Sequence, residues 1–348
     1  MGQYETNSRG VPRWFGRELA ALPRREFGQR LELAFKYWRL RGFPYANLGR
    51  RDVEEEFQRL ERTSVDPLKG DYLVSSTLGL RLANSFHPQM WHVPVHGRSP
   101  VECFCDDAVL RRALGKAVHF WPDRRCWNDQ CVRSLMRIYH RSRVSNFRPT
   151  AARSLIARFS DDGDTVLDFS AGYGGRLLGA LTLRRHYVGI DPARAQFNGL
   201  RRMHAAVAAI ARGTAEIHQA CAEDCLPRMR GGCANLVFSS PPYFDHEKYS
   251  SENTQSWRRY RTYSEWRERF LKPVVHHSHR VLKNRGYFLV NVIDLPRVPL
   301  LQDVQAMAVP LFGRAHVLKL WLSTMPAERA ARGRKFRWEP ILVFQKVC

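Results

Sequence analysis

The feature that most constrains the fold is a short apolar run that ends in an acidic residue and a glycine-rich turn. Thr165-Val166-Leu167-Asp168 is typical of a buried strand, and glycines follow at positions 172, 174 and 175. A helical pattern covers 177–183, and a second apolar run, Tyr187-Val188-Gly189-Ile190-Asp191, comes after it. This order predicts a βαβ unit of a parallel sheet with a right-handed crossover.

The alternation of strands and helices continues along the rest of the chain. The further elements expected are helices over 195–211 and 262–281 and strands at 216–218, 235–238, 287–292, 315–322 and 340–346. Thr262 and Glu265 have capping-box spacing at the start of the second helix, and Gly286 is expected to end it. The pattern predicts an α/β fold with a doubly wound, Rossmann-like parallel sheet.

The first 144 residues have a different character. A helical pattern over 27–60 places Leu31, Phe35 and Trp38 on one face and is broken at 42–44. Helical patterns return over 107–141. A chain of 348 residues exceeds one average domain. We therefore expect a mainly helical accessory region at 1–144 and a catalytic domain at 145–348.

The amino-acid composition limits which kinds of partner the protein can bind. Hydrophobic residues make up 44% of the chain, which is enough for a sizeable core, and the net charge of +23 favours a polyanionic partner. Basic residues exceed acidic ones in both halves, so the charge does not locate a binding face. No apolar run is long enough to span a membrane, and the N-terminus lacks a signal pattern, so we expect a cytoplasmic protein without a membrane partner.

The eight cysteines are expected to be reduced thiols. Cys103, Cys105, Cys126 and Cys131, with His119 between the pairs, form the one arrangement that resembles a zinc site. Their spacing does not match the usual paired knuckles. Buried thiols and no metal are therefore the prediction.

The glycine turn predicts a cofactor site, because ligands of such sheets bind beyond the carboxyl ends of the strands. Glycine lets the backbone turn sharply and approach a ligand closely. Asp191, at the end of the second strand, can accept hydrogen bonds from both hydroxyls of a ribose. The residues predicted here to bind the cofactor are Asp168, Phe169, Ser170, Gly172, Gly174 and Asp191.

The motif favours S-adenosylmethionine over a dinucleotide. A dinucleotide site wants a third glycine three residues after the second, and Leu177 occupies that position. Glu223 and Asp224 follow the third strand, where a carboxylate can meet the adenine ring of the cofactor. For these two residues, a role at the N-terminus of a helix is an equally good interpretation.

A second motif, Ser240-Pro241-Pro242-Tyr243, follows the fourth strand and predicts a pocket for an amino group on a planar ring. An exocyclic amine is a poor nucleophile, because its lone pair is shared with the ring. The Ser240 hydroxyl and a main-chain carbonyl of the two prolines can accept its protons, and Tyr243 offers a flat face for stacking. The alternative is a polyproline-type turn after a buried strand.

Together these motifs resemble those of the exocyclic-amino methyltransferases that modify DNA at adenine N6 or cytosine N4. The segment Asn146-Phe147-Arg148 is similar to the one that packs on the methionine end of the cofactor in that family, and 339–344 resembles its closing strand. The resemblance covers 145–348. It implies a class I methyltransferase sheet, S-adenosyl-L-methionine as cofactor and a DNA base flipped out of the duplex.

Serine at position 240 slightly favours cytosine N4 over adenine N6. Two other functions remain open: an RNA base methyltransferase, for example at guanine N2, and a nucleic-acid-binding protein without turnover. No segment for target recognition is inserted between the third strand and Ser240. Recognition is therefore expected from 1–144, aided by aromatic and basic residues over 244–261.

Overall fold

The computed structural model describes residues 14–66, 68–94, 97–140, 144–246, 248–324 and 336–347. The chain divides into two compact units. The helical unit contains the described residues of Met1–Asn47 and Pro88–Ser145, and the sheet unit contains those of Leu48–His87 and Asn146–Cys348. The chain therefore crosses between the units three times, and 48–87 belong to the sheet unit although they precede residue 145.

The helical unit is built around aromatic and aliphatic side chains. Its elements are α1 (Gly16–Ala20), α2 (Arg24–Arg41), the 3-10 turn η1 (Pro88–His92), α5 (Pro100–Cys105), α6 (Asp107–Phe120) and α7 (Asp129–His140). Trp38 and Trp127 are fully buried, and the Trp127 indole donates a hydrogen bond to the carbonyl of Leu114 at 2.9 Å. The break predicted near Gly42 is the end of α2, where Gly42 has φ +78°.

Three cysteines of this unit, Cys103, Cys126 and Cys131, lie in its apolar core, whereas Cys105 is exposed. Burial raises the pKa of the Cys126 thiol to about 11 and that of Cys131 to about 12, so both stay protonated at neutral pH. His119 is exposed. In the part of the chain that the structure describes, no three His, Cys, Asp or Glu side chains are grouped as metal ligands. None of the helices in the described ranges is long and apolar enough to cross a membrane.

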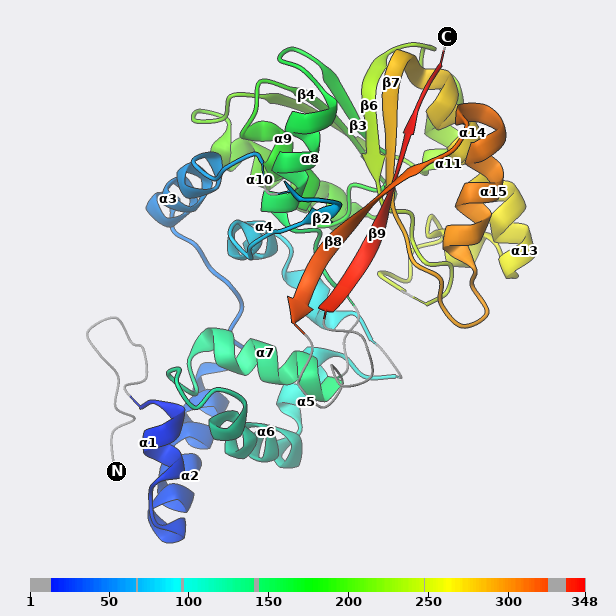
Figure 1. Cartoon of the computed structure of the whole chain (residues 1–348). Helices are drawn as coiled ribbons and strands as arrows, with labels where there is room; N and C mark the ends of the chain where they lie inside the picture. Colours follow the sequence, from blue (N-terminus) through cyan, green and yellow to red (C-terminus); the bar gives the residue numbers. More distant parts are fainter. Residues whose placement is uncertain are drawn as a thin grey trace. The chain divides into compact units, whose positions relative to one another are not determined.

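The sheet unit has one mixed, mostly parallel sheet (Figure 1). Its strands are β1 (Leu68–Lys69), β2 (Tyr72–Leu73), β3 (Thr165–Asp168), β4 (His186–Asp191), β5 (Thr214–Gln219), β6 (Ala234–Ser239), β7 (Leu282–Asn291), β8 (His316–Thr324) and β9 (Phe336–Gln345). Their order is β1-β2-β8-β9-β7-β6-β3-β4-β5. Strands β3 to β7 pair in parallel, whereas β9 is antiparallel to β7 and β8.

Helices cover both faces of this sheet (Figure 1), so two apolar cores lie on either side of it. On one face are α3 (Arg50–Glu61), α4 (Leu80–Ser85), α8 (Pro149–Phe159), α9 (Gly175–Leu181) and α10 (Arg194–Val207). On the other are α11 (Ala222–Cys225), the 3-10 turn η2 (Leu226–Arg228), α13 (Tyr263–Trp266), the π-helical turn η3 (Arg267–Leu271), α14 (Lys272–Val281) and α15 (Leu300–Phe312). The short helix α12 (Ser256–Arg259) precedes α13. The doubly wound, Rossmann-like sheet predicted from the sequence is therefore confirmed.

Three details differ from the sequence-based expectation. Strand β9 is antiparallel to β7 and β8, whereas the sequence pattern predicts a parallel sheet. Strand β7 begins at Leu282, which pairs with Ala234, so Gly286 lies inside the strand and does not end the helix. Finally, β2 pairs in parallel with β8, Tyr72 opposite Lys319, so a segment assigned to the accessory region extends the sheet.

Candidate active site

The candidate site lies where the order of the parallel strands reverses. Strand β3 has β4 on one side and β6 on the other, so the chain winds in opposite directions from it. The loops after β3, β4 and β6 leave from the same, carboxyl edge of the sheet. A ligand of a doubly wound sheet binds at this switch point. The two predicted motifs follow β3 and β6, so both begin at this edge.

Glycine is favoured at the three positions after β3 for different physical reasons. Gly174 has φ +75°, and a Cβ there would lie 2.1 Å from the Met203 methyl carbon on α10. A Cβ on Gly175 would lie 1.9 Å from the Phe147 carbonyl oxygen. Gly172 has φ +56°, yet the nearest atom to its added Cβ is 3.8 Å away. Two glycines therefore permit close packing, and Gly172 leaves one side of the turn open.

Asn146 holds this turn from the segment before α8. Its Oδ1 accepts a hydrogen bond from the Gly175 amide at 3.1 Å, and its Nδ2 donates to the Tyr173 carbonyl at 2.9 Å. Phe147 packs edge-on against Phe238 of β6, with ring centroids 5.3 Å apart. Asn146 and Phe147 thus touch the turn or the strands beside it.

Arg148, the third residue predicted in this segment, is directed elsewhere. Its guanidinium donates to Ser75 Oγ at 3.0 Å, and burial lowers its pKa. This contact joins the segment before α8 to the chain that follows β2. A contact between Arg148 and a cofactor stays a prediction.

Asp168 is the centre of a buried network. It is fully buried, and Arg176 donates to it from Nε at 2.7 Å and from Nη2 at 3.2 Å. Tyr187 and Ser239 add their hydroxyl groups, each at 2.7 Å. The Ser170 amide donates to both Asp168 and Ser239. Because Ser239 immediately precedes the Ser-Pro-Pro-Tyr motif, this network joins the two motifs.

The charges of this network compensate each other. Burial lowers the pKa of the Arg176 guanidinium, but the nearby carboxylate of Asp168 raises it by more, so the pKa is raised overall. Burial, and then Asp168, raise the pKa of Tyr187 well above its usual value, so the phenol stays protonated and donates. Phe169 is also buried, in the core of the sheet unit. The carboxylate of Asp168 thus organises the turn, and its direct contact with a cofactor stays a prediction.

Asp191 ends β4 and faces the open part of the turn. Its Oδ2 accepts a hydrogen bond from the Gly172 amide at 2.8 Å, and its Oδ1 accepts one from the Ala193 amide at 3.0 Å. Each oxygen keeps a lone pair that can accept a further donor. Burial raises the pKa of this carboxyl to about 7. In the first turn of α10, Gln196 is 3% exposed, and its Oε1 has no hydrogen-bond partner in the described chain.

Glu223 and Asp224, at the start of α11, are bound to the segment around α12. Arg259 donates to a carboxylate oxygen of each at 2.7 Å, and the Tyr260 hydroxyl donates to Glu223 at 3.0 Å. Burial raises the pKa of Glu223, which is 9% exposed, whereas Asp224 is exposed. The structure therefore gives both carboxylates a protein partner, and their contact with an adenine ring stays a prediction.

Ser240 is held at the end of β6 by the neighbouring strand. Its hydroxyl donates a hydrogen bond to the carbonyl oxygen of Asn291, the last residue of β7, at 2.8 Å. The Asn291 side chain, 5% exposed, donates to the Pro340 carbonyl of β9 at 3.0 Å. With its proton engaged in this way, Ser240 Oγ presents its lone pairs as acceptors. Pro241 is buried, while Pro242 and Tyr243 are half-buried.

The residue after the motif is backbone-strained. Phe244 has φ +51°, which a bulky side chain rarely adopts and which costs about 1–3 kcal/mol. Its ring is buried and packs against Tyr263 and Trp266, with centroids 5.8 and 6.1 Å apart. The strain is offset by this packing, which holds the end of the motif on the helix that begins at α13.

The chain then returns across the edge of the sheet. Both oxygens of Glu252 accept the Arg194 amide, at 3.2 and 3.1 Å, and Thr254 Oγ1 donates to the Pro192 carbonyl at 3.3 Å. Tyr249 lies edge-on to Tyr173 of the glycine turn, with centroids 5.9 Å apart. The loop after the motif therefore touches the turns after both β3 and β4.

This loop was expected to supply aromatics for base recognition, but two of them are core residues. Phe244 and Tyr260 are buried, whereas Trp257 is half-buried beneath the Lys248 ammonium, 5.0 Å from its ring centroid. The spacing of the aromatic residues predicted contacts with bases, but Phe244 and Tyr260 pack in the core against α13 and α11.

Sequence reasoning missed three residues that position the site: Arg176, Ser239 and Asn291. A charged residue beside a predicted helix is usually assigned to the solvent side, which hid Arg176. Asn291 could have been recognised from the sequence, because it is a polar residue at the carboxyl end of a predicted strand. Ser239 could also have been recognised, since it directly precedes the motif.

Strand β9 lies antiparallel between β7 and β8 in this doubly wound, Rossmann-like sheet. No protein-family model matches the sequence, and no curated protein sequence matches it.

Solved structures of methyltransferases are similar in fold. TrmN from Thermus thermophilus matches 57% of this chain, at 13% identity and a TM-score of 0.39, and the match spans about half (49%) of that protein. The tRNA methyltransferase TrmI from Aquifex aeolicus matches 59% of this chain and 72% of its own length, at 10% identity and a TM-score of 0.39. A putative rRNA methylase from Clostridium thermocellum matches 59% of this chain and 99% of its own length, at 10% identity and a TM-score of 0.38.

Proposed function

We propose that this protein is an S-adenosylmethionine-dependent methyltransferase that methylates an exocyclic amino group of a DNA base, with cytosine N4 favoured over adenine N6. The observation that carries the proposal is the hydrogen bond from Ser240 Oγ to the carbonyl oxygen of Asn291. It engages the hydroxyl proton, so the oxygen is oriented as an acceptor where the motif needs one to bind an amino group.

Two observations fit the cofactor. The turn is open at Gly172, where an added Cβ would meet nothing closer than 3.8 Å, so a ligand can approach the backbone. The buried Gln196 Oε1, on the turn that follows Asp191, is an acceptor without a partner in the described chain. In this proposal Gly172 and Asp191 hold the nucleoside, and Asn146 fixes the turn around it. When bound, S-adenosylmethionine supplies an electrophilic methyl group on its sulfonium.

The protein's own contribution is to position and activate the amine. Ser240 Oγ accepts one amine proton, and a main-chain carbonyl of the Pro241-Pro242 segment accepts the other. Two acceptors favour a tetrahedral nitrogen, whose lone pair is then available for the methyl group. Tyr243 stacks on the base and fixes its plane. A base must leave the duplex to reach these groups.

The partner follows from the charge and the motif. A net charge of +23 supports a polyanionic substrate, and serine at position 240 supports the cytosine N4 branch of the family that the motifs resemble. We assign target recognition to the helical unit. Its helix α2 exposes Arg24, Arg25 and Lys36, which have no acidic partner in the described ranges of the chain.

The test uses the whole protein with labelled S-adenosylmethionine. Single-stranded DNA, duplex DNA of varied sequence and structured RNA are each incubated with it, digested to nucleosides and separated. N4-methylcytosine from DNA is the expected product. N6-methyladenine would reassign the base, and product from RNA alone would move the proposal to an RNA methyltransferase. No product on any substrate, combined with no cofactor binding by calorimetry, would leave a nucleic-acid-binding protein.

A further inference from the structure

The glycine turn is also supported by a segment that comes before residue 145. Helix α4 packs in the apolar core on the same face of the sheet as α9, the helix that follows the turn. Residues 84–87 end α4 and are the last of the sheet unit before the chain enters the helical unit at Pro88. Two of them, Asn84 and His87, contact residues of the turn or the residue that holds it.

Asn84 fixes the side-chain amide of Asn146. Its Oδ1 accepts a hydrogen bond from Asn146 Nδ2 at 3.2 Å, and the same nitrogen donates to the Tyr173 carbonyl at 2.9 Å. On the other side of the amide, Asn146 Oδ1 accepts the Gly175 amide proton at 3.1 Å. A side-chain amide donates from its nitrogen and accepts at its oxygen, so two acceptors beside Nδ2 hold Oδ1 toward Gly175. Asn84 therefore orients the residue that holds the turn.

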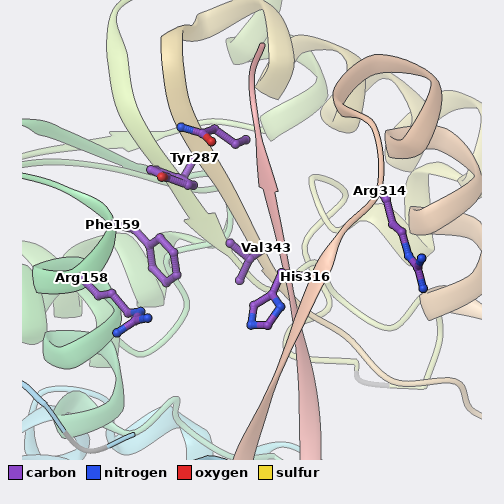
Figure 2. Close-up of a pocket in the computed structure, with 7 residues that line it drawn as sticks. Arg158, Phe159, Tyr287, Arg314, His316 and Val343 are labelled. Carbon is purple, nitrogen blue, oxygen red and sulfur yellow. The ribbon is translucent and has the colours of Figure 1, made fainter. Parts of the chain in front are cut away.

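Helix α8, which follows Asn146, is anchored at its far end without any help from Asn84. There the Phe159 ring packs against Tyr287 of β7, with centroids 5.1 Å apart, beside a hollow between the helix and the strands (Figure 2). Removal of the Asn84 amide should therefore leave α8 in place and free only the side chain of Asn146.

His87 supports the ring of Tyr173, which lies between the glycines of the turn. It is fully buried, and its ring is edge-on to that of Tyr173, with centroids 5.5 Å apart. Helix α10 makes room for it at Gly199, where a Cβ would overlap the imidazole. Burial, and then the charge of Arg202, lower the pKa of His87 to about 3, so the ring stays neutral. Arg202 also donates to the Phe86 carbonyl at 3.2 Å, so α10 holds the segment that carries His87.

We infer that Asn84 and His87 are positioning residues of the cofactor site. Asn84 sets the amide of Asn146, His87 sets the ring of Tyr173, and together they keep the glycine turn in the shape that binds the cofactor. The inference rests on the proposed function for the identity of that ligand. It extends the site to 84–87, outside the range 145–348 that the family resemblance covers, and it requires no contact of either residue with the cofactor.

The experiment uses four variants of the whole protein. Asn84→Leu removes the acceptor and keeps a similar shape, whereas Asn84→Asp keeps the acceptor. His87→Ala removes the ring. Phe159→Leu is the matched control, because it removes an aromatic contact at the far end of α8. Calorimetry measures the affinity for S-adenosylmethionine, urea unfolding measures stability, and hydrogen exchange of the cofactor-free protein compares protection of 172–178 with that of α14.

Asn84→Leu should weaken cofactor binding about tenfold, the scale of one lost hydrogen bond, while Asn84→Asp should stay within about twofold of the wild type. His87→Ala should also weaken it about tenfold, because Tyr173 loses its packing partner. In both weakened variants 172–178 should exchange about tenfold faster, with a smaller change in α14. Phe159→Leu should lower the urea midpoint and leave cofactor affinity within about twofold.

Three results would overturn the inference. The first is wild-type affinity and wild-type exchange of the turn in Asn84→Leu and His87→Ala. The second is a loss in Asn84→Asp as large as that in Asn84→Leu. The third is an equal loss of affinity in Phe159→Leu, which would reduce the effect to general stability. If the wild-type protein binds no S-adenosylmethionine, the proposed function fails, and exchange of 172–178 alone decides whether Asn84 and His87 hold the turn.

Discussion

The two halves of the candidate active site are built in opposite ways. Around the glycine turn, Asp168 and Arg176 are buried, and their polar atoms are engaged by side chains from four segments. In the amino-group half, Ser240 is half-buried and is held by one hydrogen bond to Asn291. The first half is part of the protein core. The second is a rigid stretch of backbone that carries a few side chains.

This difference predicts how the halves respond to substitution. Changes at the glycine turn should affect stability and ligand binding together, because the same hydrogen bonds serve both. Changes in the Ser-Pro-Pro-Tyr motif should affect the chemical step and leave the fold intact.

Arg176→Met should have the largest effect. It leaves the Asp168 carboxylate buried without a compensating charge, which lowers the free energy of unfolding by about 3–5 kcal/mol. Urea denaturation measures it. Arg184→Met is the matched control, because Arg184 is exposed, and we expect a change below about 0.5 kcal/mol. Equal stability of the two variants would show that the buried pair does not hold the core.

Ser240→Ala should slow methyl transfer about 10²–10³-fold, comparable to the loss of one preorganised polar group in an active site. Cofactor affinity should stay within about twofold, and the free energy of unfolding should fall by only about 1 kcal/mol. Single-turnover rates and calorimetry separate these quantities. Ser251→Ala, an exposed serine of the following loop, is the control. A variant with the wild-type rate would remove Ser240 from the amino-group pocket.

Asp191 predicts a pH dependence of stability. Its pKa is raised to about 7 in the folded protein, whereas an unfolded aspartate titrates near 4. Between these values the folded state binds the extra proton, so folding is favoured at low pH and becomes less favoured as pH rises toward 7. The free energy of unfolding should fall by roughly 1–3 kcal/mol between pH 5 and 8. The same fall in Asp191→Asn would contradict this assignment.

Gly172→Ala and Gly163→Ala test the open side of the turn. Both glycines have positive φ, and neither has an atom closer than 3.8 Å to an added Cβ. Each substitution should cost about 1 kcal/mol of stability from backbone strain. We expect only Gly172→Ala to weaken cofactor binding, about tenfold by calorimetry. If both variants bind the cofactor equally well, the ligand does not approach the turn at Gly172.

Much of the fold could be predicted, because the elements that carry it are local patterns. The strand that ends at Asp168, the glycine turn and the strand that ends at Asp191 are each visible within a few residues. The capping contact of Thr262 with the Glu265 amide, at 3.1 Å, was predicted from spacing alone. These features depend on periodicity and turn chemistry, which a sequence shows directly.

The features that sequence reasoning missed depend on contacts between distant segments. The ion pair of Arg176 with Asp168 requires a charged side chain to turn inward, and no local pattern marks this. Arg259, which binds Glu223 and Asp224, comes from a segment some 35 residues away. The pairing of Tyr72 with Lys319 joins strands from nearly opposite ends of the chain. Such partners are chosen by packing and not by neighbouring residues.

The pairing of β2 with β8 also has a consequence for the order of folding during synthesis. Residues 72 and 73 leave the ribosome long before 319 and 320, so the hairpin of β1 and β2 must wait for its partner with an unpaired edge. The helical unit ends at residue 145 and can fold while the sheet unit is still being made. The last step is then closure of the very long loop between β2 and β8, which makes late pairing of β2 the slow phase to look for in refolding.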